Sequence, residues 1–260
     1  MSGDPVAGQI ARLADRPERA AISLDFDGTI APIVDDPAAA RPLPGVVDLL
    51  GPLADRYAAV ALVSGRPATY LASHAAAPGV RYLGMYGLEE IVEGRVQVDR
   101  GLEAARPAVA AARRDLAADP AVLESGAHLE DKRYAVAVHT RRVADPARWA
   151  GPVGQAAERV AAANGLEVVP GRMVWELRPQ VRSDKGDAVR RVAAESGARR
   201  LVVAGDDLGD LPAFAVAAEA GGGLRVAVRS EEAPAELLDA ADLVVDGPEG
   251  VRELLEHLLR

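Results

Sequence analysis

Several residue types are scarce in this sequence, and each scarcity excludes a class of structure. There is no cysteine, so disulfide bonds, thiol catalysis and zinc sites with cysteine ligands are excluded. Aromatic residues make up only 3% of the 260 residues, so a core must consist mainly of Ala, Val and Leu. No apolar run is long enough to span a bilayer, and the N-terminus lacks the apolar run of a signal peptide. We therefore expect a cytoplasmic protein of one large domain or two modest ones.

Positive charge is scarce as well, and lysine most of all. The net charge of −9 argues against nucleic acid or an anionic membrane as the main partner. Of the 30 cationic residues only Lys132 and Lys185 are lysines, and the rest are arginines. A coding bias toward arginine would leave lysine only where a planar fork cannot replace a compact point charge. Both lysines are therefore candidates for functional positions.

Apolar runs alternate with helix-like segments at both ends of the chain. Fully buried strands are predicted at residues 21–24, 58–63, 81–83 and 201–204, and further strands at 224–228 and 242–246. Helices are predicted at residues 45–57, 68–76 and 185–196, and an amphipathic helix at 251–260. This alternation predicts an α/β fold, in which helices cover both faces of a parallel sheet.

The middle of the chain has a different pattern. It predicts a helix at 102–118 with Pro107 in its first turns, a half-buried strand at 134–139, a helix at 152–163, and a hairpin over 166–179 that turns at Pro170-Gly171. Such a unit would be a small open-faced antiparallel sheet with two helices. We therefore expect residues 1–102 and 180–260 to form the core, and residues 103–179 to form an inserted α+β unit.

Carboxylates follow two of the predicted buried strands. The stretch LDFDGT places Asp25 and Asp27 after the first strand, and GDDLGD places Asp206, Asp207 and Asp210 after the fourth. The ends of parallel strands share one crevice, where like charges raise each other's pKa unless a cation neutralises them. The pattern predicts a Mg²⁺ site, because Mg²⁺ prefers hard oxygen ligands. Carboxylates of Asp25 and Asp206 and the carbonyl of Asp27 would bind it, while Asp207 and Asp210 would bind ligand waters or hold the loop.

Neighbouring residues suit a phosphate group. Hydroxyl and N–H groups from Thr29, Ser64 and Gly65 could hold phosphate oxygens, and Gly28 allows the loop to turn sharply. Lys185, at a helix start, would help to offset phosphate–carboxylate repulsion, since two unit charges ~4 Å apart interact by ~4 kcal/mol at an effective dielectric of ~20.

Structural roles remain alternatives for several of these residues. Asp206 and Asp207 could cap a helix, and Arg66 could form an ion pair instead of binding phosphate. In the middle unit, Glu130 and Lys132 could belong to a solvated charged turn, and His139 could be structural.

The motifs DFDGT, SGR, K and GDDxxD, in this order, resemble the four signatures of the haloacid dehalogenase-like (HAD) phosphohydrolases. The stretches LEDKRYAVAVHTR and VWELRP resemble cap segments of trehalose-6-phosphate phosphatases, as does the proline in DFDGTIAPI. The resemblance extends from about Ile22 to Arg260. It implies a HAD-like Rossmannoid core with an inserted C2-type cap, and Mg²⁺-dependent hydrolysis of trehalose 6-phosphate, the last step of trehalose biosynthesis.

The same resemblance implies a role for each matching residue. Asp25 would be the nucleophile that forms an aspartyl-phosphate, and Asp27 would be the general acid and then the general base. Ser64 and Lys185 would bind the phosphoryl group, and Asp206 would complete the metal site. The residues implied to bind the substrate from the cap are Glu130, Lys132, Arg141 and Glu176, and Arg66 is a further candidate from the core.

Other functions stay open at this level. The same chemistry could act on another sugar phosphate, such as sucrose 6-phosphate. A non-catalytic sugar-phosphate sensor would not need Asp27, and a receiver-type signalling domain would be about half as long and would need no cap. Tyr86 stands where the resembled family often has histidine, which leaves one sugar contact undefined. The sequence does not show whether a trehalose-6-phosphate synthase binds.

Overall fold

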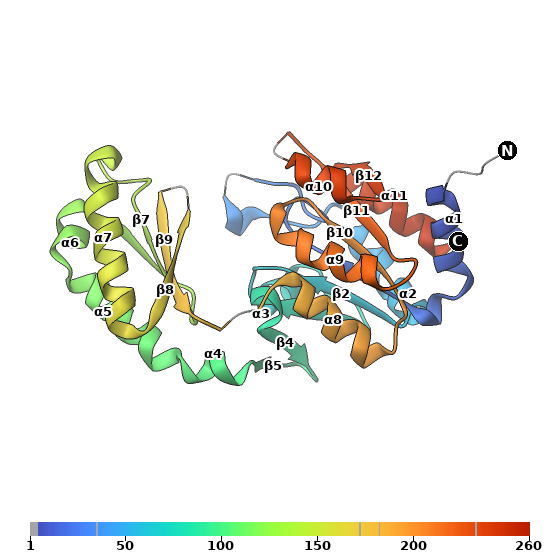
Figure 1. Ribbon diagram of the computed structural model, residues 1–260, viewed down its shortest axis with the longest axis horizontal. Coiled ribbons are helices and arrows are strands. Elements are labelled where there is room, and N and C mark those ends of the chain that lie inside the picture. Colours follow the sequence, from blue (N-terminus) through green and yellow to red (C-terminus); the bar gives the residue numbers. More distant parts are fainter. Residues whose placement is uncertain (1–4, 35, 172, 182, 232) are drawn as a thin grey trace. The chain divides into compact units, whose positions relative to one another are not determined.

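The computed structural model describes residues 5–34, 36–171, 173–181, 183–231 and 233–260 (Figure 1). The chain divides into two compact units, one of Met1–Gln97 with Ser183–Arg260 and one of Val98–Arg182. The sequence placed these boundaries after residues 102 and 179. We call the units the core unit and the cap unit.

The core unit is built on an eight-stranded sheet in the order β12-β11-β10-β1-β2-β3-β4-β5. Its strands are β1 (Ala20–Leu24), β2 (Ala59–Val63), β3 (Val80–Gly84), β4 (Glu89–Val92), β5 (Arg95–Val98), β10 (Arg200–Gly205), β11 (Leu224–Arg229) and β12 (Leu243–Asp246). The strands from β12 to β3 are parallel, which confirms the expected α/β class. The sequence did not predict β4 and β5, which are short, mix charged with apolar residues and are mostly half-buried or exposed, and β4 pairs antiparallel with β3.

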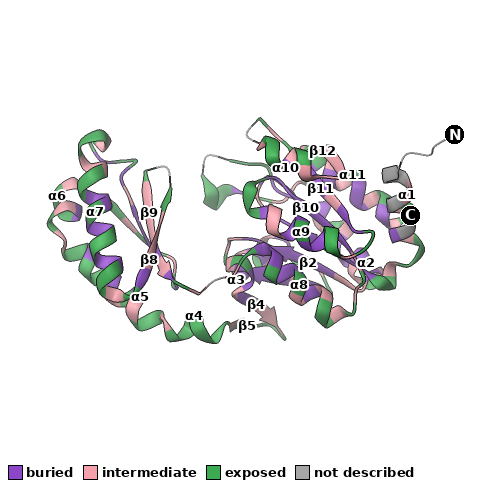
Figure 2. Ribbon diagram, in the orientation of Figure 1, coloured by how far each residue is buried: buried purple, intermediate pink, exposed green. Residues whose placement is uncertain are grey.

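Helices cover both faces of this sheet, because its central strands are apolar on both sides. Ile22 and Leu24 of β1 belong to one hydrophobic core, and Ala21 belongs to the other. Figure 2 shows that the strands at the centre of the core sheet are largely buried. The first core includes residues of α1 (Pro5–Asp15), α2 (Val46–Arg56), α3 (Ala68–His74) and α11 (Gly247–Leu259). The second includes residues of α8 (Lys185–Ser196), α9 (Leu211–Glu219) and α10 (Ala235–Ala240). Short 3₁₀ turns are η1 (Pro17–Arg19), η2 (Pro37–Ala39), η3 (Met85–Gly87) and η4 (Leu208–Asp210).

The cap unit is an antiparallel sheet with helices packed on one face. Its strands, in the order β6-β7-β9-β8, are β6 (His128–Asp131), β7 (Val136–His139), β9 (Val174–Pro179) and β8 (Leu166–Gly171). Its helices are α4 (Arg100–Ala104), α5 (Arg106–Ala118), α6 (Pro120–Ser125) and α7 (Pro146–Asn164). Trp175 and Leu177 of β9 pack against α5 and α7 in one hydrophobic core, whereas Val174 and Glu176 lie on the opposite face. The open-faced antiparallel sheet is thus confirmed.

Three details of the cap unit differ from the sequence prediction. The helix expected at 102–118 consists of α4 and α5, and Pro107 lies in the first turn of α5. Helix α7 starts before Pro152, because Asp145 caps its N-terminus by accepting a hydrogen bond from the N–H of Arg148. The hairpin turns after Gly171, and not at Pro170-Gly171, since both residues still pair with β9.

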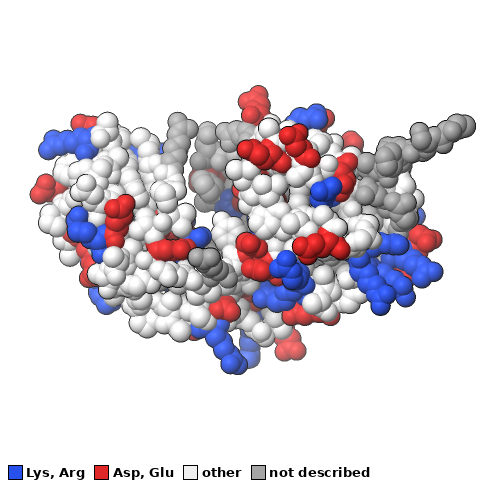
Figure 3. Space-filling model, viewed as in Figure 1, with Lys and Arg blue, Asp and Glu red and all other residues white. Residues whose placement is uncertain are grey.

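Two general properties of the described residues bear on function. None of the described helices is both long enough and apolar enough to cross a membrane. On the face that Figure 3 shows, acidic and basic side chains of the described residues are interspersed.

Candidate active site

Three polar side chains follow the carboxyl ends of neighbouring strands in the core sheet. Asp25 follows β1, Ser64 follows β2 and Asp206 follows β10, and β1 lies between the other two strands. The N–H of Asp25 donates to the carbonyl of Ala204 at 3.0 Å, which fixes the end of β1 against β10. The carboxyl edge of a parallel sheet therefore brings these side chains together, as the sequence predicted.

Lys185 lies among the carboxylates of this edge. It is the first residue of α8, and its ammonium is 2.7 Å from Oδ1 of Asp210, 3.0 Å from Oδ2 of Asp25 and 4.0 Å from Oδ1 of Asp207. Its side chain is only 5% exposed. Burial lowers the pKa of Lys185, but the charges of Asp25 and Asp210 outweigh burial and raise it above its ordinary value. The ammonium of Lys185 is thus in contact with the predicted nucleophile.

The loop after β10 is held by its own carboxylates. Oδ2 of Asp210 accepts the N–H groups of Asp206 and Asp207, at 3.1 and 3.2 Å. The largely exposed Asp207 caps η4 by accepting the N–H of Gly209 at 2.8 Å. The capping role considered for the Asp206-Asp207 pair therefore belongs to Asp207, while Asp210 holds the loop and Lys185 together.

Three carboxylates form a cluster that could hold a metal ion. Asp25, Asp206 and Asp210 each place an oxygen within 4.8 Å of the others. Burial, followed by the charges of Asp25 and Asp210, raises the pKa of Asp206 to about 8. Burial and the charge of Asp25 raise the pKa of Asp210 to about 7 although Lys185 opposes this, and burial raises the pKa of Asp25. Because one ammonium faces several carboxylates, the donor set fits a divalent cation.

Gly28 leaves room for this cluster, and replacing it provides a test. A Cβ atom at Gly28 would lie 1.9 Å from Oδ2 of Asp206, and the residue has a φ of +72°. We expect Gly28→Ala to displace the Asp206 carboxylate, and to lower both divalent-cation affinity and the free energy of unfolding. Gly94→Ala is the matched control, because Gly94 has a φ of +73° and open space around it. The control should show only the backbone strain of about 1–2 kcal/mol. Unfolding free energy is measured with urea and cation affinity by titration. Equal losses of both quantities in the two variants would contradict the close contact between Gly28 and Asp206.

Asp27, the predicted acid/base, makes a bidentate ion pair with Arg66. Nε of Arg66 lies 2.7 Å from Oδ2 and Nη2 lies 2.6 Å from Oδ1 of Asp27. The guanidinium also donates to the carbonyl of Pro37 at 2.6 Å and lies 4.4 Å from the ring centroid of Tyr70. The structure thus shows the ion-pair role for Arg66, and substrate binding by Arg66 stays a prediction.

The predicted phosphate-binding residues lie in two tight turns. Ser64 is buried, and its carbonyl accepts the N–H of Tyr86 at 2.9 Å. A Cβ atom at Gly65 would come within 2.8 Å of the Tyr86 ring, so Tyr86 packs closely on this turn. Thr29 is fully buried, and its hydroxyl has no hydrogen-bond partner among the described residues. Contacts of Ser64, Gly65 and Thr29 with phosphate stay predictions.

One buried residue near the site was missed from sequence. Glu89, at the start of β4, is only 4% exposed and accepts the N–H of Ala68 at the N-terminus of α3. This contact supports the helix that follows Arg66 and Pro67. A buried glutamate in a charged stretch could have been recognised only if the hairpin β4–β5 had been predicted.

Three predicted sugar-binding residues of the cap unit have charged or polar partners, and one partner is His139, for which the sequence favoured a structural role. The ammonium of Lys132 lies 2.5 Å from Oε2 of Glu176, and Nε2 of His139 lies 2.9 Å from Oε2 of Glu130. Glu130 and Glu176 both lie beside Ala137 of β7, on the sheet face opposite α5 and α7. The two sets therefore form one polar face. Arg141 is exposed, two residues after β7.

Comparison with known proteins places the chain in a family. The family model for trehalose-phosphatase matches residues 23–242, which include both the strand-end carboxylates and the polar face of the cap unit. The chain belongs to the trehalose-phosphatase family. A trehalose-phosphate phosphatase of Mycobacterium leprae is 35% identical to this chain over an alignment of 273 positions, gaps included. The alignment covers 100% of this chain and 62% of that protein. The chain thus spans about three fifths to two thirds of the length of the curated relatives it matches.

Solved structures show the same fold. A trehalose-6-phosphate phosphatase related protein superposes with a TM-score of 0.71 at 24% identity, over 92% of this chain and 96% of that one. A haloacid dehalogenase-like hydrolase from Bacteroides thetaiotaomicron has a TM-score of 0.62 at 18% identity, over 91% of this chain and 98% of that one. The HAD-like core with an inserted cap, expected from the motifs, is therefore confirmed for this trehalose-phosphatase family member.

Proposed function

We propose that the chain is a Mg²⁺-dependent phosphatase that hydrolyses trehalose 6-phosphate to trehalose and phosphate. The observation that carries the proposal is the ion pair of Lys185 with Asp25, beside a cluster of carboxylates that fits a divalent cation. Family membership and the name of the Mycobacterium leprae relative support the sugar phosphate as substrate.

The two aspartates after β1 would divide the reaction between them. An oxygen of Asp25 attacks phosphorus while the bond from phosphorus to the sugar oxygen breaks, and Asp27 gives its proton to that oxygen. The carboxylate of Asp27 then takes a proton from water. The oxygen of this water attacks phosphorus, breaks its bond to Asp25 and releases phosphate. Lys185, with hydroxyl and N–H groups from Thr29, Ser64 and Gly65, would hold the phosphate oxygens.

The ion pair with Arg66 constrains the acid/base step. Both carboxylate oxygens of Asp27 accept hydrogen bonds from Arg66. Each oxygen keeps a second lone pair, which could carry a proton toward the leaving group. The ion pair would therefore fix the orientation of the carboxyl group during the acid/base step.

The metal would be held by carboxylates already in place. Asp25 and Asp206 would supply side-chain oxygens and Asp27 its backbone carbonyl, while Asp207 and Asp210 would contact ligand waters or hold the loop. When bound, Mg²⁺ supplies positive charge that reduces repulsion between the phosphate and Asp25.

The raised pKa of Asp206 gives this metal site a pH signature. Its pKa of about 8 in the folded protein compares with an ordinary value of 3.8. Between these values the folded chain binds more protons than the unfolded chain, so without metal the free energy of unfolding should fall as pH rises from about 5 to about 8. Mg²⁺ should reverse this loss, because it binds the deprotonated carboxylates of the folded state. Denaturant unfolding with EDTA or Mg²⁺ across this range tests it, and parallel curves would contradict the site.

The polar face of the cap unit would select the sugar. Lys132 and Glu176 offer a donor and an acceptor next to each other, and Glu130 and His139 offer a second such set. Arg141 adds a further donor. Sugar hydroxyls both donate and accept hydrogen bonds, so these pairs suit a disaccharide better than an apolar leaving group.

Replacing Glu176 separates the sugar contact from the chemistry. We expect Glu176→Gln to raise KM for trehalose 6-phosphate roughly tenfold, because a hydrogen bond to a charged group contributes about 1.5–3 kcal/mol. Hydrolysis of a small aryl phosphate should be unchanged. Glu158→Gln, on the exposed side of α7, is the matched control. Equal effects of Glu176→Gln on both substrates would refute a role in sugar recognition.

Two alternative functions would use the same core site. The same reaction on another sugar phosphate, such as sucrose 6-phosphate, would need only a different hydrogen-bond pattern in the cap. A non-catalytic sensor would bind the sugar phosphate without turnover, and the presence of Asp27 disfavours it. The cytoplasmic location expected from the sequence is part of the proposal, and a synthase partner is not.

A further inference from the structure

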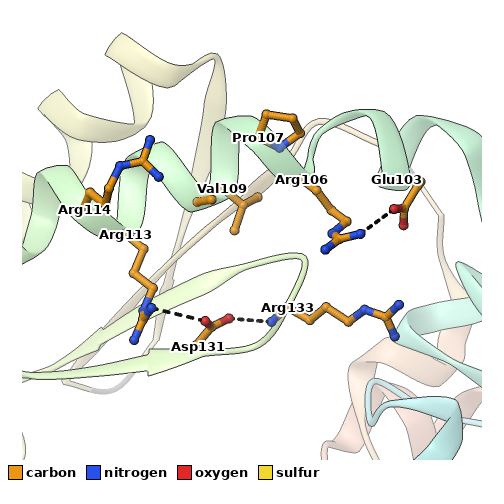
Figure 4. Close-up of a pocket in the computed structure, with 9 residues that line it drawn as sticks. Glu103, Arg106, Pro107, Val109, Arg113, Arg114, Asp131 and Arg133 are labelled. Carbon is orange, nitrogen blue, oxygen red and sulfur yellow. Dashed lines mark hydrogen bonds and ion pairs between the residues drawn. The ribbon is translucent and has the colours of Figure 1, made fainter.

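A hollow of about 770 Å³ lies within the cap unit, between α5 and the turn that joins β6 to β7 (Figure 4). One face of α5 forms one wall, because its lining residues recur at helical spacing. The turn between β6 and β7 forms the opposite wall. The lining residues are Glu103, Arg106, Pro107, Val109, Ala110, Arg113, Arg114, Asp131 and Arg133.

The hollow is positively charged in a protein whose net charge is −9. Four arginines line it against two carboxylates. Nη1 of Arg106 lies 2.7 Å from Oε1 of Glu103, and Nη1 of Arg113 lies 3.6 Å from Oδ2 of Asp131. Neither Arg114 nor Arg133 forms an ion pair with a described carboxylate, although the guanidinium of Arg133 lies 4.9 Å from the ring centroid of Tyr134. The lining thus has an excess of two positive charges.

The hollow suits a ligand larger than a free phosphate ion. Its volume falls in the usual range for sites of small organic molecules. The guanidinium fork matches phosphate oxygens, and each arginine offers several donors. The chemical class that fits both size and charge is a phosphorylated small molecule that carries at least two negative charges.

The wall formed by the β6–β7 turn connects the hollow to the polar face of the cap. Asp131 and Arg133 line the hollow, whereas Lys132, between them, pairs with Glu176 on the other side of the sheet. The turn is tight, because Arg133 has a φ of +67° and the N–H of Arg133 donates to Asp131 at 2.8 Å. Tyr134 is almost fully buried and donates to Glu103 of α4 at 2.7 Å. A ligand in the hollow would therefore contact the two residues that flank Lys132.

We propose that this hollow is an effector site for a phosphorylated small molecule, and that its occupancy alters sugar recognition through Lys132. The binding part is independent of the proposed enzymatic function. The effect on sugar recognition rests on that function.

Binding can be measured without turnover, with inorganic pyrophosphate as the probe. In a titration followed by amide NMR, the signals of Asp131 and Arg133 should shift in a saturable way. Arg114→Gln/Arg133→Asn should weaken this binding by roughly tenfold or more, since charge-assisted hydrogen bonds are lost. Asparagine is chosen at position 133 because it tolerates a positive φ. Arg148→Gln/Arg159→Gln removes the same charge from exposed positions of α7 and should match the wild type.

Equal affinities in the wild type and the Arg114→Gln/Arg133→Asn variant, or no shift of these amides up to about 10 mM pyrophosphate, would overturn the site. Parallel titrations with a nucleoside triphosphate and glucose 6-phosphate show which kind of phosphate ester binds more tightly than pyrophosphate. Tighter binding of either ester supports a small-molecule site, and weaker binding of both overturns the assigned ligand class.

The effect on sugar recognition is tested by kinetics at fixed free Mg²⁺. Pyrophosphate should change KM for trehalose 6-phosphate in the wild type but not in the Arg114→Gln/Arg133→Asn variant. Competition at the core site would affect an aryl phosphate equally and would persist in the variant, so the two effects are separable. An unchanged KM in the presence of demonstrated binding overturns the coupling to Lys132. A complete lack of turnover would refute the proposed function and leave the binding result standing.

Discussion

Replacing Asp25 with asparagine is expected to lower phosphate release by roughly 10⁴-fold or more, because the variant lacks the nucleophile. The amide keeps the shape of the side chain. It also replaces a carboxyl group whose pKa is raised by burial, so an unfavourable buried charge is removed. The fold should therefore be at least as stable as the wild type. Phosphate release and denaturant unfolding of the same preparation test both statements.

Asp239→Asn, at an exposed position of α10, is the matched control and should retain full activity. Activity of Asp25→Asn above about a tenth of the wild type would contradict nucleophilic catalysis by Asp25. Loss of activity together with unfolding would not separate the roles, so the unfolding midpoint must be measured alongside.

Replacing Lys185 with methionine is expected to destabilise the protein by about 3–5 kcal/mol near neutral pH, because buried carboxylates lose their cation. Asp25 and Asp210 both lie within 3.0 Å of the ammonium. The destabilisation should be smaller at lower pH, where these carboxylates take up protons instead. Activity should also be lost, because the phosphate would lack a cationic partner.

A second substitution distinguishes lost charge balance from lost packing. Lys185→Met/Asp210→Asn removes one carboxylate together with the ammonium, while the asparagine oxygen can still accept N–H groups from the loop. We expect this double variant to be more stable than Lys185→Met, with a coupling free energy of about 0.5–3 kcal/mol. Strictly additive losses would mean that the pair does not interact as the distances indicate.

The arrangement of the strand-end carboxylates was predictable because it follows from topology. Buried apolar runs alternating with helices specify a parallel sheet, and such a sheet gathers the residues that follow its strands. The convergence of Asp25, Ser64 and Asp206 could therefore be predicted without knowing any side-chain contact. The rarity of lysine was a second, independent signal, since both Lys132 and Lys185 form ion pairs with carboxylates at the predicted positions.

The contacts between distant side chains were not predictable in the same way. The pairing of Asp27 with Arg66 depends on how two loops face each other, and neither loop has a periodic pattern. The turn near Pro170-Gly171 was misplaced because proline and glycine usually mark turns. Here Gly171 still pairs within the sheet, where a Cβ atom would lie 2.7 Å from Val174. The basic hollow behind the β6–β7 turn likewise appears only when α5 and that turn are brought together.

The most direct test is phosphate release with Mg²⁺ from trehalose 6-phosphate, sucrose 6-phosphate, glucose 6-phosphate and an aryl phosphate, with Asp25→Asn as the blank. We expect clear preference for trehalose 6-phosphate and no release by Asp25→Asn. Release from the aryl phosphate alone would retain the core chemistry and reject the sugar assignment. Absence of release from all four substrates by folded, Mg²⁺-loaded protein would contradict the proposed phosphatase.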